Sequence, residues 1–285
     1  MRPPTEPYKG FFAQPIVFAA NFSFRVDIPP SYQKSLEGEE GSADDEALGI
    51  LYEEMDRAGI RIGVMNGRHS DILIKPCHVE DDYLATISEH SQGRLVGLAG
   101  VNFDKPMDEI VVGIDKAVKE LGMKGVCIEP GLASTPMYAE DEKLMPIYQK
   151  CTELSVPLLF MTGPFSGPDI SYTDPVHFQR VSENFPGLPI VLGHGCYPFI
   201  TEAIGVAFKS GFGAGVFVSP DVYVFAAGGE DYIKGINWIP HRFLFATAYP
   251  FGNCEQVVER TLNLPIDKDV LPQYMYENAK TLLKL

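Results

Sequence analysis

The strongest constraint on the fold is the regular alternation of short apolar runs with segments of helical pattern along all 285 residues. Such alternation is typical of parallel α/β proteins, in which a helix follows each strand and returns the chain. The runs are nearly continuous, as expected for strands that are buried on both faces. Eight of them are predicted as strands, at residues 15–24, 61–66, 95–101, 124–129, 156–162, 188–194, 215–220 and 243–248.

Segments of helical periodicity lie between these runs, near residues 46–58, 107–122, 140–154, 174–185, 198–209, 253–263 and 270–284. Eight strand–helix units without a break in composition predict a single (β/α)8 TIM barrel over residues 1–285. Within it, residues 1–14 are predicted to be an N-terminal extension and residues 33–45 an acidic loop. The alternative is an open doubly wound sheet. The lack of a Gly-rich phosphate turn after the first run favours the barrel.

The charge balance narrows the classes of partner. The chain has 38 acidic and 23 basic residues, a net charge of -15, which argues against nucleic acid or an anionic membrane surface. A locally positive site for a small anion is still possible. No apolar run approaches the roughly 18–20 residues of a membrane span, and no signal-peptide pattern is present. The five cysteines are scattered without C-x-x-C spacing. We therefore expect a cytoplasmic protein.

Several phrases occur in the order and at the spacing of the amidohydrolase-related family: EEMDRAGI, GRLVGLAGVN, ELGMKGVCIEPG, LMPIYQKCTELSVPLLF, FPGLPIVLGHG and FLFATAYPFG. The chain resembles this family, whose branch includes metal-dependent decarboxylases of aromatic and unsaturated acids. The resemblance implies a site at the C-terminal ends of the barrel strands. It also implies one divalent metal, bound by an H-x-H pair ending strand one, histidines on strands five and six, and an aspartate ending strand eight.

This sequence departs from that ligand pattern at most positions. Ser23 and Arg25 stand in place of the H-x-H pair, Met161 in place of the strand-five histidine and Ala248 in place of the aspartate. Only His194 matches. A lone imidazole does not hold a metal tightly, and a guanidinium at Arg25 would oppose a cation. We therefore expect neither a bound metal nor another cofactor.

Three residues are candidates for catalysis. His194 is either a general acid–base at the barrel mouth or a histidine that is merely hydrogen-bonded there. Arg25 either replaces the metal as a fixed cation, binding a carboxylate or a developing oxyanion, or pairs with Glu129 or Asp221. Glu129 is either a general base or an ion-pair partner.

Six further residues are candidates for substrate binding. An apolar Met161 at the mouth favours a ligand with an aromatic or aliphatic body. Cys196, two residues after His194, is interpreted as a buried, inert thiol. The six candidates are Ser23, Arg68, His69, Met161, Tyr249 and Asp221.

Three hypotheses for function follow. The first is a metal-independent hydrolase or decarboxylase-like lyase that acts on a small carboxylated substrate, open-chain or cyclic, with a homodimer as the candidate assembly. It requires His194, Arg25 and Glu129 to converge. The second is a catalytically silent barrel that binds a small acid or a partner protein, with Arg25 neutralised and Met161 filling the cavity. The third retains a metal through His194, Glu129 and Asp221.

Overall fold

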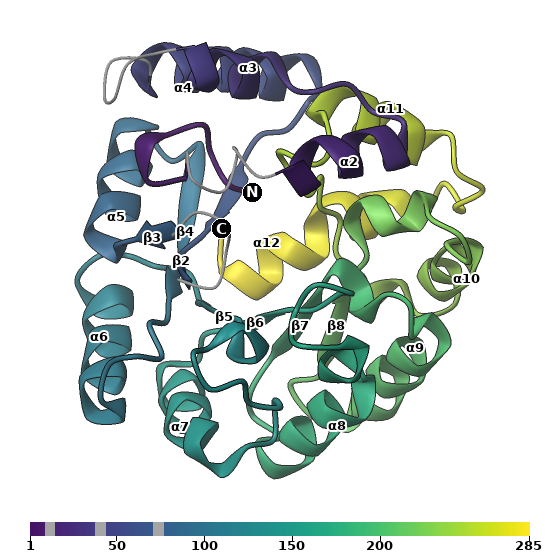
Figure 1. The fold of residues 1–285 in the computed structure, drawn as a ribbon. Helices are drawn as coiled ribbons and strands as arrows, with labels where there is room; N and C mark the ends of the chain where they lie inside the picture. The colour runs from purple at the N-terminus through teal and green to yellow at the C-terminus, as the bar shows by residue number, and fades with distance from the viewer. Residues whose placement is uncertain (9–14, 38–43, 71–76) are drawn as a thin grey trace.

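The computed structural model describes residues 1–8, 15–37, 44–70 and 77–285. Its centre is a curled sheet of parallel strands surrounded by helices (Figure 1). The strands lie in the order β1 (Gly63–Asn66), β4 (Leu95–Gly100), β5 (Val126–Ile128), β6 (Leu158–Met161), β7 (Ile190–Gly193) and β8 (Val216–Ser219). These are the predicted strands two to seven, and the predicted α/β barrel is confirmed.

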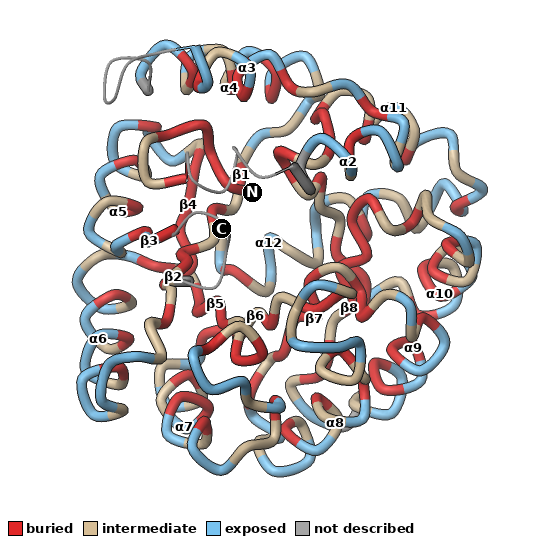
Figure 2. Tube along the Cα trace, viewed as in Figure 1, coloured by how far each residue is buried: buried red, intermediate tan, exposed pale blue. Residues whose placement is uncertain are grey.

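Helices connect the strands on the outside of the sheet. Figure 2 shows buried residues toward the sheet and exposed ones on the outer helix faces. The helices are α4 (Asp44–Arg57), α5 (Asp81–His90), α6 (Met107–Lys119), α7 (Met145–Leu154), α8 (Pro175–Asn184), α9 (Ile200–Lys209), α10 (Glu230–Trp238) and α11 (Cys254–Leu262). The sequence did not predict α5, α10 or the antiparallel hairpin β2 (Arg68–Ser70) and β3 (Cys77–Val79).

The strands present two different faces, as β6 shows. Leu158 and Phe160 are fully buried beneath the helices, and the Phe160 ring lies 5.0 Å from that of Phe178 on α8. Leu159 and Met161 are partly exposed and belong to a separate apolar cluster inside the barrel. Because successive side chains of a strand point to opposite faces, the residues of the second set line the lumen.

The C-terminal helix α12 (Asn278–Leu283) lies at one end of the lumen. In Figure 1 it crosses the centre of the ring, and Leu283 packs with Leu98 and Cys127 of the barrel wall. Lys284 Nζ donates to the carbonyl of Ser155, which precedes β6, at 2.9 Å. The helix therefore covers the N-terminal ends of the strands and leaves the C-terminal ends as the mouth.

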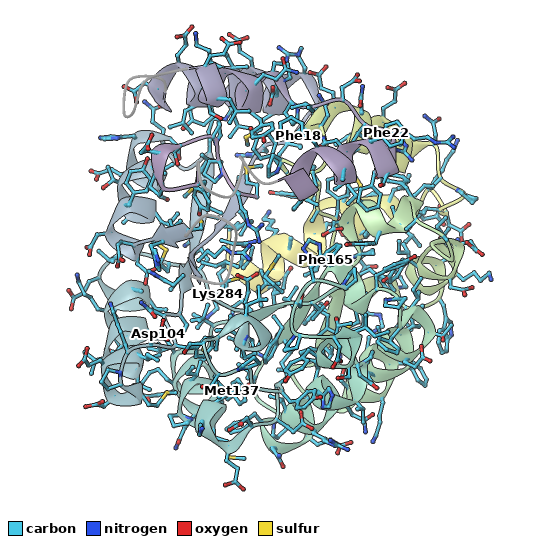
Figure 3. All side chains as sticks on the ribbon, in the orientation of Figure 1. Phe18, Phe22, Asp104, Met137, Phe165 and Lys284 are labelled. Carbon is cyan, nitrogen blue, oxygen red and sulfur yellow. The ribbon has the colours of Figure 1, made fainter. Side chains whose placement is uncertain are left out.

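The prediction of a first strand at residues 15–24 is wrong, because this segment is the helix α2 (Pro15–Phe24). Phe18 and Phe22 lie one turn apart on it and are 44% and 87% exposed (Figure 3). Ser23 Oγ donates to the Ala19 carbonyl four residues back, at 2.8 Å. A short apolar run does not by itself distinguish a strand from a helix, and here it lies outside the barrel.

Residues 1 and 2 lie in the barrel wall beside β1, between β1 and the segment that contains Tyr249. The Met1 nitrogen donates to the Val64 carbonyl, and the Asn66 N–H donates to the Met1 carbonyl at 3.2 Å. On the other side, the Arg2 N–H donates to the Tyr249 carbonyl at 3.2 Å. The predicted N-terminal extension is therefore corrected for residues 1–8, which are part of the barrel. Residues 9–14 lie outside the described residues.

The segment predicted as the eighth strand is irregular. Residues 243–248 form one bridge, between Val218 and Phe243, instead of the predicted strand, and the chain turns at Ala248, where φ is 51°. The predicted acidic loop is also corrected, since α3 (Pro30–Glu37) includes residues 33–37 and α4 begins at Asp44. Residues 38–43 lie outside the described residues.

None of the helices in the described part of the chain is both long and apolar enough to cross a membrane.

We predict that Leu283→Ala lowers the free energy of unfolding by about 2–4 kcal/mol, because it removes a buried side chain from the lumen cluster. Leu262→Ala on α11 is the matched control. Its side chain is 54% exposed, and the expected change is below about 0.5 kcal/mol. Urea unfolding followed by circular dichroism measures both. Equal effects of the two substitutions would contradict the packing of α12 into the lumen.

Candidate active site

A histidine–carboxylate pair lies at the barrel mouth, where β7 and β8 end. His194 follows β7, and its Nδ1 lies 2.6 Å from Oδ2 of Asp221, which follows β8. The Asp221 side chain is 5% exposed and that of His194 is 18% exposed. A carboxylate accepts hydrogen bonds, so Nδ1 is the donor in this pair, and in the neutral imidazole the lone pair is then on Nε2. The geometry suits a base whose orientation is fixed by a carboxylate.

Backbone strain marks the same two positions. The φ angles of His194 and Asp221 are 63° and 44°, values in the left-handed region that a residue with a side chain rarely adopts. Strained residues of this kind concentrate at functional sites, where the surrounding structure holds them. Thr162 supplies such support. Its Oγ1 donates to the carbonyl of Gly193 and accepts the N–H of Cys196 at 2.9 Å, so it holds the chain on both sides of His194.

An aromatic ring packs against the imidazole. The ring of Tyr223 packs edge to face against His194, with the centroids 5.6 Å apart, and Tyr197 stacks on Tyr223 at 4.8 Å. Gly163 has a φ of 109°, which favours glycine, and a Cβ there would lie 3.2 Å from the Cβ of His194, a tight contact. Tyr223, the Gly163 loop and Asp221 at Nδ1 therefore hold the imidazole in place.

A second polar cluster lies at the end of β5. Glu129 contacts two buried arginines. Its Oε2 lies 3.1 Å from Nε of Arg68, and its Oε1 lies 3.7 Å from Nη2 of Arg2. Burial, together with the charge of Arg68, lowers the pKa of the Arg2 guanidinium to about 10. Two guanidinium groups therefore surround one carboxylate at this edge of the barrel.

The structure does not bring Arg25 and Ser23 to the mouth. Both are exposed at the end of α2 on the outer surface, so the predicted roles of these two residues are corrected. The buried cation expected from Arg25 is supplied instead by Arg2 and Arg68. Sequence reasoning missed Arg2 because it assigned the first strand to the wrong segment. Arg68 was expected to contact a ligand, and it lies within the Glu129 cluster.

Met161 and Tyr249 face different surroundings. Met161 faces the lumen, with its Sδ 3.8 Å from Nδ2 of Asn66. The Tyr249 hydroxyl is buried away from the lumen, 2.7 Å from Oγ of Ser31, which also donates to Glu54 at 2.6 Å. Tyr249 therefore ties the barrel wall to α3 and α4 and does not line the mouth.

His69 and Cys196 are both shielded. His69 lies in the β2–β3 hairpin, with its ring 5.8 Å from that of His78 and its Nδ1 3.9 Å from a Glu80 oxygen. Cys196 is fully buried, and burial raises the pKa of its thiol to about 12. At neutral pH this cysteine is therefore a thiol and not a nucleophilic thiolate.

The residues at the implied metal position do not fit a divalent cation. Glu129 is paired with two arginines and Asp221 with Nδ1 of His194, so neither carboxylate is free to join Nε2 of His194 as a ligand. Ala248 has no donor atom and packs near Val222 and Val257. Over the described residues, no three histidine, cysteine or acidic side chains form a group that could hold a metal. The hypothesis of a metal bound by His194, Glu129 and Asp221 is therefore not supported.

The fold and these clusters define an α/β barrel with its polar site at the C-terminal ends of the strands. The amidohydrolase family model matches residues 53–285, and the chain belongs to this family. An uncharacterised TIM-barrel protein from Bordetella bronchiseptica has 30% identity and a TM-score of 0.89, covering 100% of this chain and 96% of that one. No curated protein matches the chain.

Decarboxylases of the amidohydrolase superfamily share the fold. The 2,6-dihydroxybenzoate decarboxylase from Rhizobium has 16% identity and a TM-score of 0.65, covering 92% of this chain and 94% of that one. The D314N mutant of 5-carboxyvanillate decarboxylase from Novosphingobium aromaticivorans, solved with bound manganese, has 17% identity and a TM-score of 0.67. It covers 92% of this chain and 86% of that one. At these identities the likeness establishes the fold alone.

A partly buried carboxyl group lies beside the mouth at the start of α5. Oδ1 of Asp81 accepts the N–H of Gly100, which ends β4, at 3.0 Å. Burial raises the pKa of Asp81 from 3.8 to about 6. Because the folded state holds this proton more tightly than the unfolded state, its contribution to stability is present below about pH 4 and is lost as the pH rises through about 6.

We predict that Asp81→Asn raises the free energy of unfolding by about 1–2 kcal/mol at about pH 8 and changes it little at about pH 4. The asparagine keeps the acceptor for Gly100 and removes the buried charge. Asp82→Asn is the matched control, since Asp82 is exposed and pairs with Lys116 at 3.3 Å. Urea unfolding at the two pH values measures the effect. An Asp81→Asn variant that is less stable at the higher pH would contradict this assignment.

Proposed function

We propose that this protein is a metal-independent hydrolase or carbon–carbon lyase that acts on a small carboxylated substrate, open-chain or cyclic, at the barrel mouth. The observation that carries the proposal is the pair of His194 and Asp221, held at 2.6 Å where β7 and β8 end. Barrels of this fold place their chemistry at this end of the strands. The decarboxylases that share the fold are named for hydroxylated or methoxylated aromatic acids, and such acids belong to the proposed substrate class.

The pair supplies proton transfer. Nε2 of His194 accepts a proton from a water molecule or from the substrate, and Asp221 stabilises the imidazolium that forms. In ester or lactone hydrolysis, the water oxygen bonds to the carbonyl carbon. The carbon–oxygen bond to the leaving group then breaks, and the proton on Nε2 passes to the leaving oxygen. In decarboxylation, the carbon–carbon bond breaks and the imidazolium protonates the carbon that loses carbon dioxide.

The arginine cluster supplies substrate binding. Arg68 and Arg2 place two positive charges beside Glu129, and a guanidinium binds carboxylates with paired N–H donors. Glu129 follows β5 and His194 follows β7, two strand spacings or roughly 10 Å along the wall. A small ring that carries a carboxylate spans this separation. The guanidinium groups also offset part of the several kcal/mol of stabilisation that a Lewis-acidic metal gives relatives.

A second candidate function is binding of a small acid without turnover. Two observations favour it: Met161 contributes to the packed lumen cluster, and Glu129 already neutralises part of the arginine charge. The two functions share the arginine cluster and differ in whether His194 is required.

We predict that His194→Asn lowers kcat by at least about 1,000-fold and that Asp221→Asn lowers it by about 100-fold or more, because the base and its orientation are lost. Arg68→Gln should mainly raise KM. The assay uses lactones, aryl esters and hydroxybenzoates, with product release followed by absorbance. His177→Asn is the matched control, since His177 also pairs with a carboxylate, Glu140 at 2.8 Å, but lies on α8.

Undiminished turnover by the His194→Asn variant would contradict the proposed role of the pair. Acids that bind to the wild type without turnover, and that fail to bind to Arg68→Gln, would establish the second candidate function instead.

A further inference from the structure

Two arginines share a hollow on the outer surface, away from the mouth. Its volume is about 410 Å³, and it lies between the end of α2 and α11. The two helices lie side by side in Figure 1, and Nη1 of Arg260 donates to the Phe24 carbonyl. The lining residues are Arg25, Phe225, Gln256, Glu259, Arg260, Asn263 and Leu264.

Neither arginine has a carboxylate partner among the described residues. The other contact of the Arg260 guanidinium is with the face of Phe225, 3.9 Å from the ring centroid. Arg25 is exposed, and its backbone is fixed by a left-handed φ of 53° and by an N–H that donates to Phe22. Burial and the nearby charge of Arg25 lower the pKa of Arg260. Like charges held close together are costly, and an anion between them would remove that cost.

Two acidic residues lie near the hollow, and neither pairs with Arg25 or Arg260 among the described contacts. Asp27 is held by Gln256, which donates to its carboxylate at 2.5 Å and accepts its backbone N–H at 2.7 Å. Glu259 lines the hollow without pairing with either arginine among the described contacts, so its charge opposes an anion. In a chain with 38 acidic and 23 basic residues, two arginines therefore line one hollow without an ion-pair partner among the described residues.

We propose that this hollow binds a small dianionic oxyanion, a phosphate or a phosphate monoester, between Arg25 and Arg260. Guanidinium groups bind phosphate through paired, charge-assisted hydrogen bonds. The cavity is within the range of roughly 300–1,000 Å³ found for small-molecule sites, so it admits a phosphate with an organic body. The site also contacts the segment that carries Asp221, because Phe225 ends the short helix η7 (Asp221–Phe225).

Isothermal titration calorimetry of the full chain with inorganic phosphate, at about pH 8 and low salt where phosphate is dianionic, tests the proposal. We expect Arg25→Gln to weaken binding at least about tenfold and Glu259→Gln to tighten it about threefold. Arg61→Gln removes another exposed arginine and should leave binding unchanged. Tighter binding of phenyl phosphate than of phosphate would identify a monoester as the ligand, and equal binding would identify free phosphate.

The absence of binding would overturn the proposal, as would phosphate binding that Arg25→Gln leaves unchanged. The second outcome would place the phosphate elsewhere, with the arginines at the mouth as the next site to test. Arg25 is exposed and outside the proposed active site, so a loss of binding in this variant does not arise from loss of the fold or of the catalytic pair.

Discussion

Closure of the parallel sheet is the constraint on which the rest of the structure depends. A curled sheet with open edges would leave backbone N–H and carbonyl groups unpaired. In this chain the gap between β1 and the irregular segment before Tyr249 is bridged by residues 1 and 2, through hydrogen bonds on both sides. This closure also carries Arg2 into the wall, beside Glu129. The fold and the charge at the mouth are therefore set by the same short segment.

The electrostatics of the mouth differ from those of a metal site. A divalent cation needs several donors with free lone pairs, whereas here the carboxylate of Glu129 faces two guanidinium groups and the carboxylate of Asp221 is bound to Nδ1 of His194. The lone pair on Nε2 of His194 does not by itself hold a metal tightly. Positive charge is fixed in side chains, and a base with an oriented proton lies two strands away. Attraction of an anion and transfer of a proton are the two operations that the proposed function requires of these side chains.

Most of the barrel could be predicted from the sequence, because six buried strands leave continuous apolar runs that alternate with helices. The first strand could not. The apolar run at residues 15–24 is a surface helix that exposes Phe22, whereas the true wall segment at residues 1 and 2 has no strand pattern at all. His194 and Glu129 were correctly predicted to follow strands, because the strands that precede them were themselves predicted correctly. Arg2 was missed, and the partnership of Asp221 with His194 depends on backbone angles that no sequence pattern shows.

In the proposed function, the His194–Asp221 pair works without a divalent metal. Metal content of the full-length protein, expressed with zinc and manganese supplied and purified without chelator, tests it most directly when measured by inductively coupled plasma mass spectrometry. We expect about zero equivalents of transition metal per chain, because the carboxylates of Glu129 and Asp221 are engaged by arginines and by His194. About one equivalent per chain, retained through dialysis, would contradict it and would require a different arrangement of these side chains.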